Sequence, residues 1–182
     1  EIEKTLLKNL ALEDVILEWI NTYDLLFKSK PSGIVPGELW RLNLDNLNWA
    51  NLIASGEKSK GLIWKWNNEA NIGFMFYDNV LALSDDEAKP FFSLSTLTFP
   101  DKCAADSKNI YCFVPGAVDG NLVLPDDYLQ KNVYFEDNLY KISLESKEGK
   151  IIFQSDDDLT IDGVNPQLMN GKIYFVNRYD SR

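Results

Sequence analysis

Residues 38–45, ELWRLNLD, decide the fold because they recur at residues 138–145 as NLYKISLE. After the first position every pair is chemically matched, and beyond the next turn Leu52-Ile53 aligns with Ile152-Phe153. Each copy alternates apolar and polar residues, as a half-buried strand does, and continues through a turn into a second strand. Repetition of such a unit indicates a chain built from several similar sheets.

A second repeated element is a short apolar run with little alternation, which is typical of a strand buried on both faces. These runs are residues 25–27, 74–77, 110–114 and 173–176. Each follows a polar turn. Taken in order, the strands predict four-stranded antiparallel units, the blades of a β-propeller.

We therefore predict an all-β fold, with residues 1–182 forming one partial β-propeller domain of about four blades, the last incomplete. The blades are expected to start near Glu18, Lys65, Lys102 and Pro166, with an insertion at residues 115–136 between the second and third strands of one blade. The alternative all-β fold is a β-sandwich, which also has many short strands. The segment containing Ile2, Leu6, Leu7, Leu10 and Asp14 reads either as a helix or as the closing strand of an earlier blade.

Composition narrows the function classes. The chain has 182 residues, 45% of them hydrophobic, which suffices for a substantial core. A net charge of −10 argues against a nucleic-acid partner, because phosphate binding needs a basic surface. The first residue is Glu and the last falls within a blade, so we expect a piece of a longer protein. Further blades would come from the parent chain or from another subunit.

Cys103 and Cys112 have the spacing of a cross-strand pair. If Ser107-Lys108 form a two-residue turn, the two cysteines lie directly opposite each other, where a disulfide is feasible. The alternative is two ordinary buried thiols. A disulfide would indicate an oxidising compartment. With two thiols and no histidine, a zinc site is not expected.

The absence of histidine removes Ser-His-Asp and Cys-His catalysis. Acidic residues are grouped at 85–87, 126–127 and 156–158. The first and last groups read as solvated loops, and the last lacks the glycine of a calcium loop. We predict no cofactor and leave open a loosely held Ca²⁺ among these carboxylates.

The insertion at 115–136 is the best candidate for a functional surface, since long loops with apolar content of their own are often functional. Its carboxylates and tyrosines suit the binding of sugars, peptides or a cation. The candidate ligand-binding residues are Asp126, Asp127, Tyr128 and Tyr134. The alternative is a loop that only packs over a neighbouring blade.

The segment 102–115, KCAADSKNIYCFVP, resembles WD40-like or TolB-like propeller blades. More narrowly, it is similar to uncharacterised membrane-anchored bacterial propellers in which a Lys-Cys…Tyr-Cys…Pro segment precedes a Pro-Asp-Asp-aromatic insertion. Here the matches are Lys102, Cys103, Asp106, Tyr111, Cys112 and Pro115, then residues 125–128 and 139–142. Ala105 stands where the family has Trp-Ser. The resemblance implies an extracytoplasmic location, with an anchor in a segment not present here, and supplies no catalytic residues.

These observations predict a non-enzymatic cell-envelope propeller that binds a protein or a surface glycan. The rival hypothesis is a carbohydrate-active enzyme that uses paired carboxylates in the propeller mouth, as two-carboxylate glycosidases do.

Overall fold

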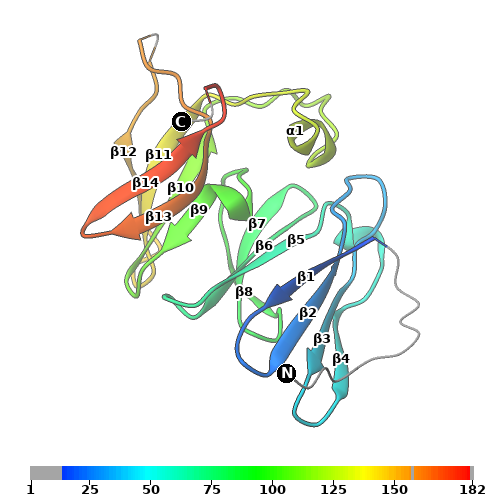
Figure 1. The fold of residues 1–182 in the computed structure, drawn as a ribbon. Helices are drawn as coiled ribbons and strands as arrows, with labels where there is room; N and C mark the ends of the chain where they lie inside the picture. The colour runs from blue at the N-terminus through cyan, green and yellow to red at the C-terminus, as the bar shows by residue number, and fades with distance from the viewer. Residues whose placement is uncertain (1–13, 157, 181–182) are drawn as a thin grey trace.

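The computed structural model describes residues 14–156 and 158–180 and is all-β, with 48% strand and 6% helix (Figure 1). The segment at residues 2–13, for which the sequence left helix or strand open, lies outside the described residues. The strands are β1 Val15–Trp19, β2 Asp24–Ser29, β3 Leu39–Asn43, β4 Asn48–Ile53, β5 Ile63–Asn67, β6 Ile72–Tyr77, β7 Val80–Ser84, β8 Pro90–Ser93, β9 Cys103–Ala105, β10 Asn109–Pro115, β11 Asp137–Ser143, β12 Gly149–Phe153, β13 Gly163–Met169 and β14 Lys172–Asn177. The helical segments are η1 Glu57–Ser59, η2 Pro100–Lys102 and α1 Asp126–Leu129.

The described strands form three consecutive four-stranded antiparallel sheets and a final hairpin. The orders are β1-β2-β3-β4, β5-β6-β7-β8 and β9-β10-β11-β12, and β13 pairs with β14. We call these the first, second and third sheets and the terminal hairpin. Each four-stranded sheet is a meander, in which every strand pairs with the next one along the chain.

The sequence repeat is also a repeat of hydrogen-bond register. In the first sheet Leu39 pairs with Ile53, and in the third sheet Leu139 pairs with Phe153. Both pairings are interrupted by a β-bulge at the next residue, between Leu39 and Trp40 and between Leu139 and Tyr140. The two stretches are therefore equivalent third strands, down to the position of the irregularity.

The short side chains that open the hairpins account for the turns. Asn21 Oδ1 accepts the N–H groups of Tyr23 and Asp24, both at 2.8 Å. Asp106 Oδ1 does the same for Lys108 and Asn109, both at 2.7 Å. A carboxylate or amide oxygen at this position satisfies turn N–H groups and fixes where the second strand begins.

The predicted cysteine hairpin is confirmed. Cys103 lies opposite Cys112, Ala104 opposite Tyr111 and Ala105 opposite Ile110. The cysteines form a disulfide with their Cα atoms 4.2 Å apart. The bond closes the β9–β10 hairpin at the third residue pair from the turn at residues 106–109.

The continuous apolar runs in β6 and β10 reflect burial on both faces. In β10, Ile110, Cys112 and Val114 belong to the core shared with the second sheet, whereas Phe113 packs with the terminal hairpin. In β6, Phe74 and Phe76 face the third sheet, and Met75 belongs to the core shared with the first sheet. Three layers of side chains therefore join the sheets in chain order.

One expectation of burial is wrong. Residues 173–176 read as a strand buried on both faces, but β14 alternates exposed and half-buried positions. Ile173 and Phe175 pack on the third sheet, whereas Tyr174 is 50% exposed. In the described part of the chain no further sheet covers the outer face of the hairpin, which explains the difference.

The segment between β10 and β11, residues 116–136, carries α1 and arches away from the third sheet (Figure 1). We call it the 116–136 loop. Within residues 14–156 and 158–180, no helix has the length and apolar character needed to cross a bilayer.

Candidate functional site

The two aspartates of the 116–136 loop stabilise backbone. Asp126 accepts the N–H of Gly33 in the β2–β3 connection, which ties the loop to the first sheet. Asp127 accepts the N–H of Val123 at 2.7 Å and the amide of Asn132 at 3.2 Å. Both carboxylates are half-buried. Their predicted role in ligand binding stays a prediction, and the structure gives them a part in shaping the loop.

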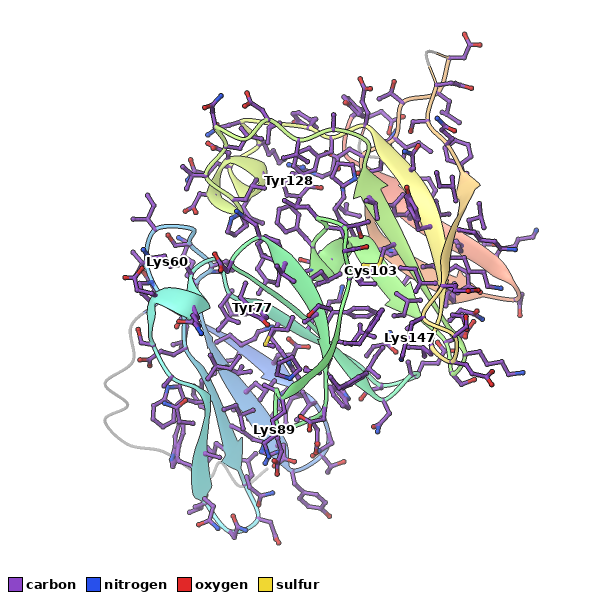
Figure 2. All side chains as sticks on the ribbon, turned by 180° about the vertical axis from the view of Figure 1, so that it is seen from behind. Lys60, Tyr77, Lys89, Cys103, Tyr128 and Lys147 are labelled. Atoms are coloured by element: carbon purple, nitrogen blue, oxygen red, sulfur yellow. A yellow bond between two sulfur atoms is a disulfide. The ribbon has the colours of Figure 1, made fainter. Side chains whose placement is uncertain are left out.

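Tyr128 is a core residue with 5% of its surface exposed. Figure 2 shows it on the side of α1 that faces the third sheet. Its ring stacks on Phe135 at 4.9 Å and packs against Phe99 at 4.8 Å. A ligand has little access to this side chain, so its contribution to a binding site would come through its neighbours.

The hydroxyl of Tyr128 belongs to a fully buried network of charges. Lys102 Nζ lies 2.6 Å from Asp137 Oδ2 and 2.5 Å from Asp162 Oδ1, and all three side chains have no exposed surface. Lys102 also donates to Tyr128 Oη at 2.9 Å, and that hydroxyl donates to Asp162 Oδ1 at 2.7 Å. The network joins η2, the 116–136 loop, β11 and the start of the terminal hairpin.

Arg178 extends the network to the surface. Its guanidinium donates to Asp162 Oδ2 at 3.0 Å and to the Tyr128 carbonyl at 2.8 Å. It lies 3.8 Å from the centre of the Tyr128 ring and 4.9 Å from that of Tyr134. Two cations then balance two carboxylates, the arrangement that makes buried charge tolerable.

Burial has the largest effect on the pKa values of Asp137 and Tyr128 in this network. It raises the pKa of Asp137 to about 6, against the opposing pull of the Lys102 ammonium. Burial, followed by the charge of Asp162, also raises the pKa of the Tyr128 phenol. Tyr128 therefore remains a neutral hydrogen-bond donor throughout the physiological range.

A groove of about 550 Å³ opens beside the exposed end of this network. We call it the tyrosine groove, because Tyr134 and Tyr179 stack at its edge with ring centres 5.5 Å apart. The two rings are 40% and 47% exposed. Its other lining residues are Gly116, Ala117, Val118, Asp119, Leu122, Asn132, Val133, Phe135, Glu136, Asn138, Gln154 and Ser155.

A second groove, of about 610 Å³, lies between β1, β5 and α1. Its charged groups are largely paired with each other: Lys65 with Asp101 at 3.0 Å, and Lys28 with Glu18. Paired groups offer fewer free contacts to a ligand, so we take the tyrosine groove as the candidate site.

Of the four predicted ligand-binding residues, the structure places only Tyr134 in the tyrosine groove. Sequence reasoning missed Tyr179, Arg178 and Asp162, which come from the terminal hairpin and its flanks. Nothing in their local spacing distinguishes them, since they meet the 116–136 loop only after the hairpin packs on the third sheet.

Among the described residues, no group of three or more Cys, Asp or Glu side chains is arranged to hold a metal ion. Asp157, in the middle of the acidic run at 156–158, lies outside the described residues. No family model matches the chain, and a search of curated proteins finds no match.

Proposed function

We propose that the chain is a non-enzymatic binding module of the cell envelope, built from β-propeller blades. Support for blades comes from three meander sheets of four strands in sequence, the pattern of propeller architecture. Further support is that the first strand of the third sheet, β9, contacts the first strand of the terminal hairpin, β13. Neighbouring first strands are what radial packing about an axis requires.

The extracytoplasmic part of the proposal is supported by the disulfide. Such bonds form and persist in oxidising compartments and are rare in a reducing cytosol. Attachment to a membrane or cell surface is part of the proposal and follows from the family resemblance.

The binding role is carried by one observation, the stacked and exposed Tyr134–Tyr179 pair at the edge of a groove. Exposed aromatic rings beside polar side chains are enriched at recognition surfaces, because they give large contact area at low loss of side-chain freedom. The guanidinium of Arg178, held by buried Asp162, lies against Tyr134 and limits its movement. A ring that is already ordered loses less entropy on binding.

Catalysis by paired carboxylates is less well supported. Asp137 and Asp162 come from different parts of the fold and converge on the same Lys102 nitrogen. They have no exposed surface, however, so a glycosidic bond would not reach them. Two-carboxylate hydrolysis needs both acids beside the substrate.

The test blocks the groove without touching the core. Glu136 is exposed, lines the groove and forms no ion pair within the described residues, so Glu136→Arg places a bulky, reversed charge at the opening. Glu145→Arg makes the same charge change on the exposed β11–β12 turn and is the matched control. Each protein is immobilised and incubated with solubilised cell envelope of the producing organism, and the retained protein and glycan are quantified.

We expect the wild type and Glu145→Arg to retain the same envelope component, and Glu136→Arg to lose most of it. Equal retention by Glu136→Arg would exclude the groove as the contact surface. Release of shortened glycan by the wild type would instead favour the enzyme.

A further inference from the structure

We infer that the tyrosine groove binds an uncharged saccharide chain. The inference rests on the proposed function and specifies its ligand. The groove combines a stacked pair of exposed tyrosine rings, amide groups with unused hydrogen-bonding capacity and an excess of negative charge.

The platform presents the kind of surface on which sugar rings stack. Tyr134 and Tyr179 are inclined by only 27° with their ring centres 5.5 Å apart, so they form a stacked pair rather than an edge-to-face pair, and both rings remain partly exposed. The face of an aromatic ring is electron-rich, and the C–H bonds on one side of a pyranose ring carry partial positive charge. Stacking of the two is therefore favourable and leaves the sugar hydroxyl groups at the rim.

The groove also contains polar groups with no partner among the described residues. Asn138 accepts the N–H of Ser155 through Oδ1 at 3.2 Å, while its NH₂ group donates to no residue of the described chain. Within the described residues the exposed Gln154 amide forms no hydrogen bond either. Glu136 accepts one hydrogen bond, from the Gly116 N–H to its backbone carbonyl, so its carboxylate is left for a ligand. Amides that both donate and accept, next to a carboxylate acceptor, match hydroxyl groups, which also do both.

Charge selects among the ligands that such a groove admits. Asp119 and Glu136 line it, and Glu136 is close enough to contribute, after burial, to raising the pKa of Tyr179. With a net charge of −10 on the whole chain, an acidic polysaccharide or a phosphate would be repelled. A basic peptide would be attracted, but only its backbone carbonyls could accept from the NH₂ groups of Asn138 and Gln154, whereas every sugar hydroxyl can both accept from these amides and donate to Glu136. An uncharged saccharide can bond to both the amide donors and the carboxylate acceptor without being repelled by the local charge.

The size of the groove is compatible with this class. Its volume of about 550 Å³ lies within the range of roughly 300–1,000 Å³ usual for small-ligand sites. The lining comes from the 116–136 loop, from Asn138 of β11, from residues 154–155 after β12 and from Tyr179 after the terminal hairpin, so one or a few sugar units would contact several of these segments.

The experiment compares tyrosine variants with defined probes. The probes are soluble laminarin, mannan, xyloglucan and starch, and chitin oligosaccharides, with polygalacturonate and a lysine-rich peptide as charged comparisons. Binding is screened by affinity electrophoresis and measured by calorimetry. Tyr179→Ala removes the exposed ring, Tyr179→Phe keeps it, and Tyr174→Ala removes an equally exposed tyrosine of β14 outside the groove.

We expect at least one uncharged saccharide to bind the wild type. Tyr179→Ala should weaken that binding by about tenfold or more, which corresponds to the loss of one well-packed aromatic contact. Tyr179→Phe and Tyr174→Ala should stay within about threefold of the wild type, because both keep the ring at position 179. Threefold corresponds to about 0.7 kcal/mol of binding free energy. Equal thermal melts for Tyr179→Ala and Tyr174→Ala would show that folding is preserved.

The inference is overturned if no uncharged saccharide binds, if Tyr179→Ala binds as well as the wild type, or if only a charged probe binds. These outcomes are separate from failure of the proposed function. If Glu136→Arg loses the envelope component and the saccharides do not bind, the groove is a binding site for another ligand. If Glu136→Arg retains it, the chain binds the component through another surface, and the tyrosine groove is excluded as the contact site.

Discussion

Asp137 is a buried carboxylate with hydrogen-bond partners on only one of its two oxygens. Its Oδ2 accepts from Lys102 and from the Gly163 N–H at 2.9 Å, whereas its Oδ1 is buried with no hydrogen-bond partner. A carboxylate that is only half solvated by the protein is costly in its charged form. This is why burial outweighs the neighbouring ammonium and raises the pKa to about 6.

Because the folded pKa of Asp137 lies above the unfolded value of 3.8, the folded state binds the proton more tightly. Its contribution to the free energy of unfolding is therefore greatest below about pH 4 and is lost as the pH rises through about 6. The expected size is about 3 kcal/mol, since each unit of pKa difference is about 1.4 kcal/mol. The Lys102 ammonium and the Gly163 N–H lower the pKa of Asp137 against the effect of burial, whereas the Asp162 carboxylate raises it.

Urea unfolding of the wild type and of Asp137→Asn between pH 4 and pH 8 checks this prediction. The wild-type free energy of unfolding minus that of the variant should fall as the pH rises through 6. A difference that stays constant over this range would show that Asp137 does not take up a proton there.

At the scale of single residues, the sequence predicts the loop that lines the proposed site, but of its four candidate side chains only Tyr134 lies in the tyrosine groove. The sequence predicts Tyr128 at the contact surface because it accompanies carboxylates in a long loop that has apolar content of its own. Its hydroxyl is instead satisfied by Lys102 and Asp162, which lie 26 and 34 residues away along the chain. Local pattern does not reveal a network assembled from four separate segments.

At the scale of elements, Gly163 fixes how the terminal hairpin meets the third sheet. A Cβ atom at this position would lie 2.6 Å from three ring atoms of Phe113, far inside van der Waals contact. Phe113 is buried and also packs on Phe175, so it has little room to move. The absence of a side chain is what allows β13 to approach β10.

Gly163→Ala should therefore lower the free energy of unfolding by about 1–3 kcal/mol, as overpacking of a core does. Gly120→Ala is the control, because a Cβ there meets nothing within 4 Å. Chemical denaturation of both variants is the measurement. If the two lose the same stability, the approach of β13 to β10 does not depend on the glycine.

The β9–β10 hairpin carries a separate prediction. The disulfide joins residues 9 apart in the sequence, and closing so short a loop removes limited entropy from the unfolded chain. Replacing both cysteines by alanine should lower the free energy of unfolding by about 2–3 kcal/mol. Dithiothreitol should destabilise the wild type by a similar amount and leave the double variant unchanged. An effect of reductant on the double variant would contradict this account.

The elements themselves were the most predictable part of the molecule. The match of residues 38–45 with 138–145 identified two equivalent third strands, and the Cys103–Cys112 spacing identified a hairpin register. Both signals are local, because a strand pattern and a two-residue turn involve neighbours in sequence. The exposure of β14 was not predictable, since an apolar run does not reveal whether a further sheet covers it.

At the scale of the whole molecule, the order of packing explains where the site lies. The third sheet is covered by the second sheet on one face and by the terminal hairpin on the other. The 116–136 loop leaves this sheet and contacts the β2–β3 connection of the first sheet through Asp126. Through Tyr134 it also contacts Tyr179, which follows the terminal hairpin. The tyrosine groove forms where this loop and the end of β14 meet, and it is therefore a product of tertiary structure.

The most direct test of the account is hydrogen–deuterium exchange of the full chain with and without the envelope component that it retains. We predict slower exchange at residues 116–119, 132–138 and 177–179, which border the tyrosine groove, and unchanged exchange at β1 and β5. Protection confined to the groove between β1, β5 and α1, or no protection at residues 177–179, would contradict the claim that the chain binds through its stacked tyrosines.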